Sequence, residues 1–337
     1  MEGLNAELTK VIHDQEKLDL HNYLKIHEGN DAEGELQAIN SVLDIASRGV
    51  GGIFDKSYVT YTYVKPHSMG FNVFVKLSHS LRETIHNTIF DVYQFRPGHA
   101  SLHSELFSAL TEATRSKQHY VYTTNYDRVI EEYCASTAGY AVTDGFAIDF
   151  RSRRNMWSPN IFDQTQLIAD VSIVKLFKLH GSLNWRLSEF GIEQVMTEDI
   201  LQQPTPVYKQ NLLIYPGSKA PPEEEPFRTL YERFETQMRR VDRCLVIGFS
   251  FRDPYLNRIF RDFLRSGSKQ LLVMSSSCRK TVAQNLLGLK EEDQVNEYVE
   301  GNNFVPIPCH FGDNNWLTMT TNALRIQQPA GSASVKG

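Results

Sequence analysis

Cysteine is scarce in this chain, and the cysteines present do not form pairs. Four occur among 337 residues, with no Cys-x-x-Cys motif. A structural zinc ribbon needs closely spaced cysteine pairs and a disulfide scaffold needs a high density of cysteines, so neither is expected. We expect the thiols to be small, buried apolar side chains. They belong to Cys134, Cys244, Cys278 and Cys309.

Long apolar runs and long basic runs are also missing. No apolar stretch could span a bilayer, and the N-terminal residues lack the apolar core of a signal peptide. Lys and Arg number 35 against 40 Asp and Glu, a formal net charge of −5. This balance does not favour direct nucleic-acid binding, although a local basic patch stays open. We expect a cytoplasmic protein with no membrane contact.

Apolar residues make up 41% of the chain, enough for a full hydrophobic core and too many for a disordered protein. The first third has a helical pattern, and apolar strand patterns then alternate with helical ones. The strands are expected near 119–124, 173–179, 243–249 and 270–275, and the helices near 126–136, 226–240, 254–265 and 279–288. Such alternation predicts an α/β fold, Rossmann-like and doubly wound, with a mostly parallel sheet, a helical N-terminal region and a small inserted lobe.

We interpret residues 1–326 as a single domain. Its helical region covers 1–98, and its Rossmann-like core covers 99–310. The polar stretch 137–172 is interpreted as an insertion or a lid. The Gly-, Ser- and Ala-containing tail 327–337 has almost nothing to bury and is expected to be disordered.

Three strand ends carry polar residues suited to a ligand site. They are Val-Tyr-Thr-Thr-Asn-Tyr-Asp at Val121–Asp127, Phe-Lys-Leu-His-Gly-Ser at Phe177–Ser182, and Val-Ile-Gly-Phe-Ser-Phe-Arg-Asp-Pro at Val246–Pro254. Ligands of open parallel sheets bind beyond the carboxyl ends of the strands. The chemistry is therefore expected at these three ends.

Each motif also has a purely structural interpretation. Gly248 and Ser250 could approach a phosphate or a ribose, or could form an ordinary tight turn before a helix that Asp253 caps. Asn125 could orient a sugar or a water through its carboxamide, while Asn125 or Asp127 could cap the next helix. The alternatives are compatible with one another.

His180 ends an apolar strand and precedes Gly181, which suggests that its ring faces the crevice. An imidazole titrates near neutral pH and can take a proton from a ribose hydroxyl or from water. A lone histidine at such a position can equally be a hydrogen-bonded core residue.

Taken together, the three motifs resemble the sirtuin-like NAD-consuming domain over roughly residues 100–290. The resemblance is closest to the divergent bacterial branch of anti-phage defence proteins, in which Thr-x-Asn-Tyr-Asp, Leu-His-Gly and Gly-Tyr-Ser-Phe-x-Asp recur. It implies a Rossmann-like domain that binds NAD as a substrate, with no metal.

The resemblance also assigns site residues. Asn125, His180 and Asp127 would be catalytic, with Asp127 near the nicotinamide end. The NAD-binding residues would be Thr124, Gly181, Ser182, Gly248, Ser250 and Asp253. The implied reaction is hydrolysis of the nicotinamide–ribose bond to nicotinamide and ADP-ribose.

Two departures from the family pattern keep alternatives open. The zinc-binding cysteine pairs of protein-deacylating sirtuins are missing, which disfavours deacylation. The Gly-Ala-Gly-x-Ser loop that cradles the pyrophosphate is not found, and Gly49–Gly52 follows a helical pattern and is interpreted as a connector. We expect either that the loop lies upstream of Met1 or that the NAD site is incomplete.

The leading hypothesis is an NAD⁺ hydrolase that depletes NAD⁺ in abortive anti-phage defence, controlled by assembly or by a partner. We expect a homo-oligomer, with a HerA-type ATPase or an Argonaute-like protein as further candidate partners. The alternatives are a non-catalytic NAD or ADP-ribose-binding scaffold and, less favoured, a protein deacylase or ADP-ribosyltransferase.

Overall fold

The computed structural model describes residues 100–164, 170–195, 211–214 and 222–326, together with isolated positions among the first 88 residues. With the exception of Ile12, those isolated positions are helical. This agrees with the helical pattern predicted for the N-terminal region. The chain divides into two compact units. The larger unit comprises Phe95–Leu179 and Ser218–Gly337, and the smaller unit comprises Met1–Gln94 and His180–Gly217.

The first parallel sheet of the larger unit has the strand order β1-β5-β2. Its strands are β1 (Gln118–Thr123), β5 (Ser172–Lys178) and β2 (Tyr140–Thr143). The central strand β5 is buried along almost its whole length, as expected of a strand covered on both faces. In the register of β1 with β5, Thr123 lies opposite Lys178, so the two strands end side by side.

The second parallel sheet has the order β11-β10-β9. It consists of β9 (Arg243–Ile247), β10 (Gln270–Met274) and β11 (Phe304–Ile307). Every residue of the central strand β10 is buried. Pro306 lies in β11, which is an edge strand in the described order, and an edge strand tolerates proline because its outward-facing amides need no partner in the sheet.

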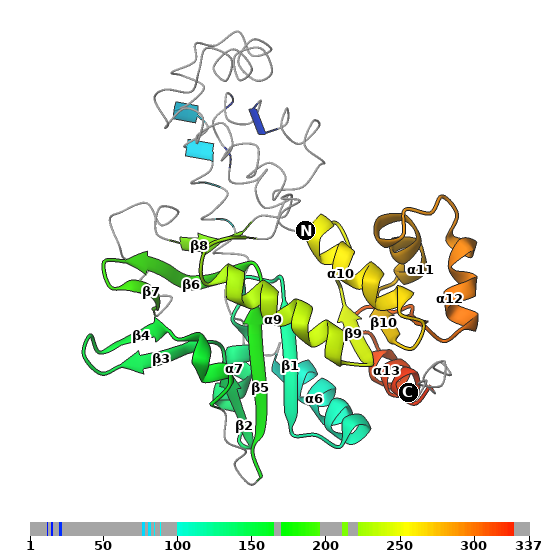
Figure 1. Cartoon of the computed structure of the whole chain (residues 1–337), viewed down its shortest axis with the longest axis horizontal. Helices are drawn as coiled ribbons and strands as arrows, with labels where there is room; N and C mark the ends of the chain where they lie inside the picture. The colour runs from blue at the N-terminus through cyan, green and yellow to red at the C-terminus, as the bar shows by residue number, and fades with distance from the viewer. Residues whose placement is uncertain are drawn as a thin grey trace, which may run out of the picture. The chain divides into compact units, whose positions relative to one another are not determined.

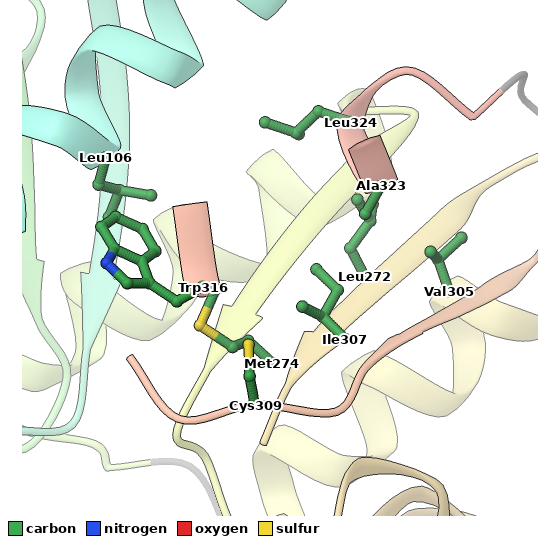
Figure 2. Packing of buried hydrophobic residues seen from close by; sticks show 9 residues of the cluster. All are labelled: Leu106, Leu272, Met274, Val305, Ile307, Cys309, Trp316, Ala323 and Leu324. Atoms are coloured by element: carbon green, nitrogen blue, oxygen red, sulfur yellow. The ribbon is translucent and has the colours of Figure 1, made fainter. Parts of the chain in front are cut away.

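Helix α6 packs against both sheets (Figure 1). It spans Ala100–Thr114. Leu106 lies in a cluster with residues of β10 and β11 and with Trp316, as Figure 2 shows. Phe107 instead packs with Val174 of β5 and Tyr133 of α7 (Val129–Ser136). The two faces of α6 therefore belong to two different hydrophobic clusters, and the helix joins the two sheets into one unit.

Of the other long helices, α9 and α10 were predicted from apolar spacing, and α13 was not. Helix α9 (Phe227–Arg240) crosses the viewer's side of β1 and β5 in Figure 1. The Tyr122 hydroxyl of β1 donates to the Arg233 carbonyl of α9 at 3.3 Å. Helix α10 is Pro254–Arg265, and α13 is Trp316–Leu324.

The C-terminal third contains shorter helical segments. They are α11 (Cys278–Thr281), a π-helical turn at Val282–Leu286, a 3₁₀ turn at Glu292–Val295 and α12 (Asn296–Glu300). The helix predicted near 279–288 is thus α-helical only in its first turn. The π turn still buries Val282, Ala283 and Leu286, which explains why its apolar pattern resembles that of a helix.

The polar stretch 137–172 is not uniform. Its first strand, β2, joins the parallel sheet beside β5. The next two, β3 (Phe146–Asp149) and β4 (Arg154–Trp157), form an antiparallel hairpin that precedes a 3₁₀ turn at Pro159–Phe162. The assignment of the whole stretch to an insertion or lid remains a prediction, as do the other domain boundaries.

The described part of the smaller unit includes an antiparallel group of strands. Strand β6 (Gly181–Ser188) pairs with β7 (Gly191–Gln194) and with β8 (Asn211–Leu213). Arg186 forms an ion pair with the buried Glu193 across the β6–β7 pair. Residues 327–337, expected to be disordered, lie outside the described residues.

All four cysteines are free thiols in the larger unit. Cys134, Cys278 and Cys309 are buried, and Cys244 is half-buried. Their prediction as buried apolar side chains is confirmed for the first three. Among the helices that the structure describes, none has the length and apolarity needed to cross a membrane.

The predicted fold class is confirmed by these elements. Strands β1, β5, β9 and β10 lie within two residues of their predicted limits, and all pair in parallel. Six of the described strands form two parallel sheets of three, flanked by helices, consistent with a Rossmann-like α/β arrangement.

Candidate functional site

The loop after β1 carries Asn125 and Asp127. The Asn125 amide donates to the Thr123 Oγ1 atom at 3.0 Å, and this local bond shapes the turn out of the strand. The Asn125 side chain is exposed, and Thr124 is half-buried. The Asp127 Oδ1 atom accepts from the Val129 amide at 3.1 Å, at the start of α7. Asp127 therefore bonds to the first amide of α7, while the N-cap position itself is occupied by Arg128. Asn125, by contrast, is exposed.

Lys178, the last residue of β5, contacts the backbone of this loop. Its side chain is only 1% exposed. The Nζ atom donates to the Tyr126 carbonyl at 3.5 Å, to the Asp127 carbonyl, and to the Glu131 Oε1 atom at 2.9 Å. Burial raises the pKa of the Glu131 carboxyl, and the neighbouring ammonium opposes that rise.

The second motif passes from the larger unit into the smaller one after Leu179. The Leu179 amide donates to the Thr123 carbonyl at 2.8 Å, which extends the β1–β5 pairing by one bond. His180, the next residue, is 1% exposed, and its carbonyl accepts from the Ile214 amide at 2.9 Å. Ser182 is fully buried in β6. The side chains of this motif are thus held inside the protein.

Gly181 has two separate reasons to be glycine. Its φ is +89°, in the left-handed region that side chains disfavour. A Cβ atom at this position would also lie 2.0 Å from the Leu212 carbonyl oxygen of the adjacent chain segment. The glycine after His180 therefore allows the backbone to turn directly from β5 into β6, close to β8.

The third motif contains the loop between β9 and α10, in which exposed residues alternate with buried ones such as Phe251. Gly248 has φ +66°, is exposed, and donates its amide to the Met274 carbonyl at 3.0 Å. No atom lies within 4 Å of the place where its Cβ would stand, so the backbone there is open to a ligand. Ser250 is exposed, while its carbonyl accepts from Asn285 Nδ2 at 2.8 Å. The peptide backbone of the loop is fixed, but its hydroxyl group is accessible.

Asp253 caps α10 as the sequence predicts. Its Oδ1 atom accepts from the Tyr255 and Leu256 amides, each at 2.9 Å, and Pro254 occupies the first turn. The residue is 5% exposed. The carboxylate thus already serves the helix, and its assignment to NAD binding remains a prediction.

Replacing Asp253 by Ala is expected to lower the free energy of unfolding by about 1–2 kcal/mol, because two buried amides of α10 lose their acceptor. Asp253→Ser keeps a capping oxygen and should lose much less. Urea unfolding of the three proteins measures the difference. Equal stability of Asp253→Ala and the wild type would contradict the capping role.

A chain of aromatic rings connects the first and third motifs within the larger unit. Tyr122 of β1 lies 5.0 Å from Phe234 of α9, which lies 5.7 Å from Phe260 of α10. Phe260 in turn lies 5.9 Å from Phe249, between Gly248 and Ser250. The two loops are therefore attached to one continuous aromatic core.

Within the larger unit, the structure connects the first motif, the third motif and the part of the second motif that ends at Leu179. Asn125 and Asp127 lie on the loop that Lys178 holds, and the aromatic chain connects this loop's strand to the Gly248–Ser250 loop. His180, Gly181 and Ser182 belong to the smaller unit, so their convergence with Asn125 remains a prediction. Within the described residues, no cluster of three or more His, Cys, Asp or Glu side chains could hold a metal ion.

Parallel strands with polar loops at their carboxyl ends define an α/β protein of the Rossmann-like class, in which ligands bind beyond those strand ends. A comparison with family models identifies the domain more closely. The model described as the SIR2-like domain matches residues 119–307, more than half of the chain. The chain therefore belongs to the SIR2-like family. SIR2-like domains use NAD, which is compatible with an NAD-dependent activity. A comparison with curated proteins found no match.

Sequence reasoning missed Lys178 and Glu131 as parts of the site region. Lys178 stands in the apolar run Ile173–Leu179, where a lysine is unusual unless its ammonium has a partner. An acidic partner could also have been sought in Glu131, which lies in the helical segment that follows Asn125. A charge inside an apolar strand was therefore the signal that could have found this contact.

Proposed function

We propose that the protein is an NAD⁺ glycohydrolase that cleaves the nicotinamide–ribose bond and releases nicotinamide and ADP-ribose. The observation that carries this proposal is the match of the SIR2-like family over the segment that contains all three strand-end motifs. The exposed carboxamide of Asn125 and the open backbone of Gly248 support it, because both groups are accessible to a ligand.

In the proposed reaction, a water oxygen forms a bond to the anomeric carbon of the ribose as the bond to the pyridinium nitrogen breaks. The bonding electron pair stays with that nitrogen, so the cationic pyridinium leaves as neutral nicotinamide. The sugar passes through an oxocarbenium-like state that nearby polar groups stabilise. The proton of the water goes to His180 and from there to solvent.

Asn125 would orient the ribose and the attacking water, since a carboxamide can donate and accept at once. Asp127 would act by holding the Asn125 loop, consistent with its bond to the Val129 amide. Thr124, Gly181, Ser182, Gly248, Ser250 and Asp253 would line the NAD-binding pocket.

The proposed biological role is depletion of NAD⁺ in bacterial anti-phage defence. Uncontrolled loss of NAD⁺ would kill the host, so the activity would be held back until assembly or a partner releases it. We propose a homo-oligomer in the cytoplasm, with a HerA-type ATPase or an Argonaute-like protein as candidate regulators.

The test is release of nicotinamide from NAD⁺ by the purified protein, alone and with each candidate partner. A time-dependent rise of nicotinamide with equal formation of ADP-ribose is the expected result. Dependence on an acylated peptide would instead indicate a deacylase, and no release under any condition would overturn the proposal.

A second candidate function is a scaffold that binds NAD or ADP-ribose without turnover. It is favoured by the bonds of Asp127 and Asp253 to helix-terminal amides, which commit both carboxylates to the fold. Calorimetric binding of ADP-ribose with no nicotinamide release would support the scaffold over the hydrolase.

A further inference from the structure

The buried lysine at the end of β5 bonds to the backbone of the Asn125 loop through its side chain. Lys178 lies opposite Thr123 in the register, and its side chain extends to the α7 side of the sheet, where Glu131 lies. Its Nζ atom contacts two successive carbonyls, those of Tyr126 and Asp127. These carbonyls belong to the two residues that follow Asn125.

We propose that Lys178 is a positioning residue, which fixes the loop 124–128 so that the Asn125 carboxamide has a single orientation toward the substrate. The proposal rests on the proposed NAD⁺ hydrolysis. Lys178 itself is 1% exposed and covered by the loop, so it acts through Asn125 and does not touch the substrate.

Burial explains why a lysine fits this role. An ammonium has three donors, and here they are directed to two loop carbonyls and one carboxylate. The Glu131 carboxylate, also nearly buried, balances the charge, and charge-assisted bonds of this kind are stronger than neutral ones. Removing the ammonium would leave the carboxylate buried without its counter-charge and would release both carbonyls.

The same strand offers a matched control. Lys175 is also buried, at 8% exposure, and its Nζ atom also donates to a backbone carbonyl, that of Phe162 at 2.6 Å. It lies three residues before Lys178, so the two side chains extend to opposite faces of β5. Lys175→Met therefore removes a buried ammonium from β5 without touching the Asn125 loop.

The first measurement is hydrogen exchange of the amides in 124–131, which does not depend on any activity. Lys178→Met should accelerate exchange in this segment relative to the wild type, whereas Lys175→Met should not. Unchanged exchange in Lys178→Met, or equal acceleration in both variants, would overturn the proposal. Absence of NAD⁺ turnover in the wild type would refute the proposed function alone, because the exchange result stands without it.

The second measurement separates positioning from stability. Lys178→Met is expected to lower kcat for nicotinamide release by about 10²-fold, the effect of a small misplacement of a catalytic group, with a much smaller change in ADP-ribose affinity. Lys175→Met should retain kcat. Lys178→Met combined with Glu131→Leu removes the buried charge pair and should recover stability, while kcat stays low. Recovery of kcat together with stability would show that Lys178 serves only the fold.

Discussion

Substitution of Asn125 or His180 by Ala is expected to abolish nicotinamide release from NAD⁺ while the protein stays folded. Asn125 is exposed on its loop, so its removal takes away an orienting group with little loss of packing. His180 would supply the base, and loss of a general base typically lowers a rate by about 10²–10⁴-fold. Initial rates of nicotinamide formation measure both effects.

His180 needs its own control because it is buried. His119 of β1 is a second buried histidine, at 6% exposure, and its Nε2 atom is hydrogen-bonded to Thr111 Oγ1 at 3.0 Å. Any loss of activity that comes only from a cavity in the core should appear in His119→Ala as well. Turnover that persists in a folded His180→Ala variant would refute the catalytic role.

Replacing Gly181 by Ala is expected to destabilise the protein by about 3 kcal/mol or more. The positive φ of +89° costs about 1–2 kcal/mol for a residue with a Cβ. The added Cβ would lie 2.0 Å from the Leu212 carbonyl oxygen, and because this atom belongs to the backbone it cannot rotate away. Denaturant unfolding gives the loss of free energy directly.

Gly267→Ala separates the two causes. Gly267 also has a positive φ, +70°, but no atom lies within 4 Å of its Cβ position. It should therefore show only the conformational cost, about 1–2 kcal/mol. If the two variants lose the same stability, the contact between β6 and β8 at Gly181 does not constrain the fold.

The elements that the sequence predicted best are those whose burial is uniform. Strand β10 is buried at every residue, and its apolar run Leu271–Met274 is unambiguous. Strand β2 was missed because it is only four residues long and half-buried throughout, within a stretch that is otherwise polar. Strand β11 contains Pro306, which argues against a strand unless the strand lies at an edge, and edge position depends on the tertiary structure.

The candidate site was predictable to the extent that its residues follow strands directly. Asp253 was expected to cap α10, and it does so through two amides. From Gly181 the sequence predicted only that the His180 ring faces the crevice, and strand β6, which begins at Gly181, was not predicted. One reason for the glycine, the Leu212 carbonyl oxygen, lies 31 positions away in the chain and cannot be seen in the local sequence. Lys178 illustrates the same limit, since the carbonyls it binds become visible only when β1 and β5 lie side by side.

The three buried thiols and the half-buried Cys244 can report on local opening of the larger unit. Burial raises the pKa of Cys134 and of Cys244 to about 12, and it also raises the pKa of Cys278 and Cys309. Little reactive thiolate therefore exists at neutral pH while the protein is folded. Alkylating reagents should modify these sulfurs chiefly through transient opening, and peptide-resolved labelling rates would distinguish loosening of α7, which carries Cys134, from loosening of β9, which carries Cys244.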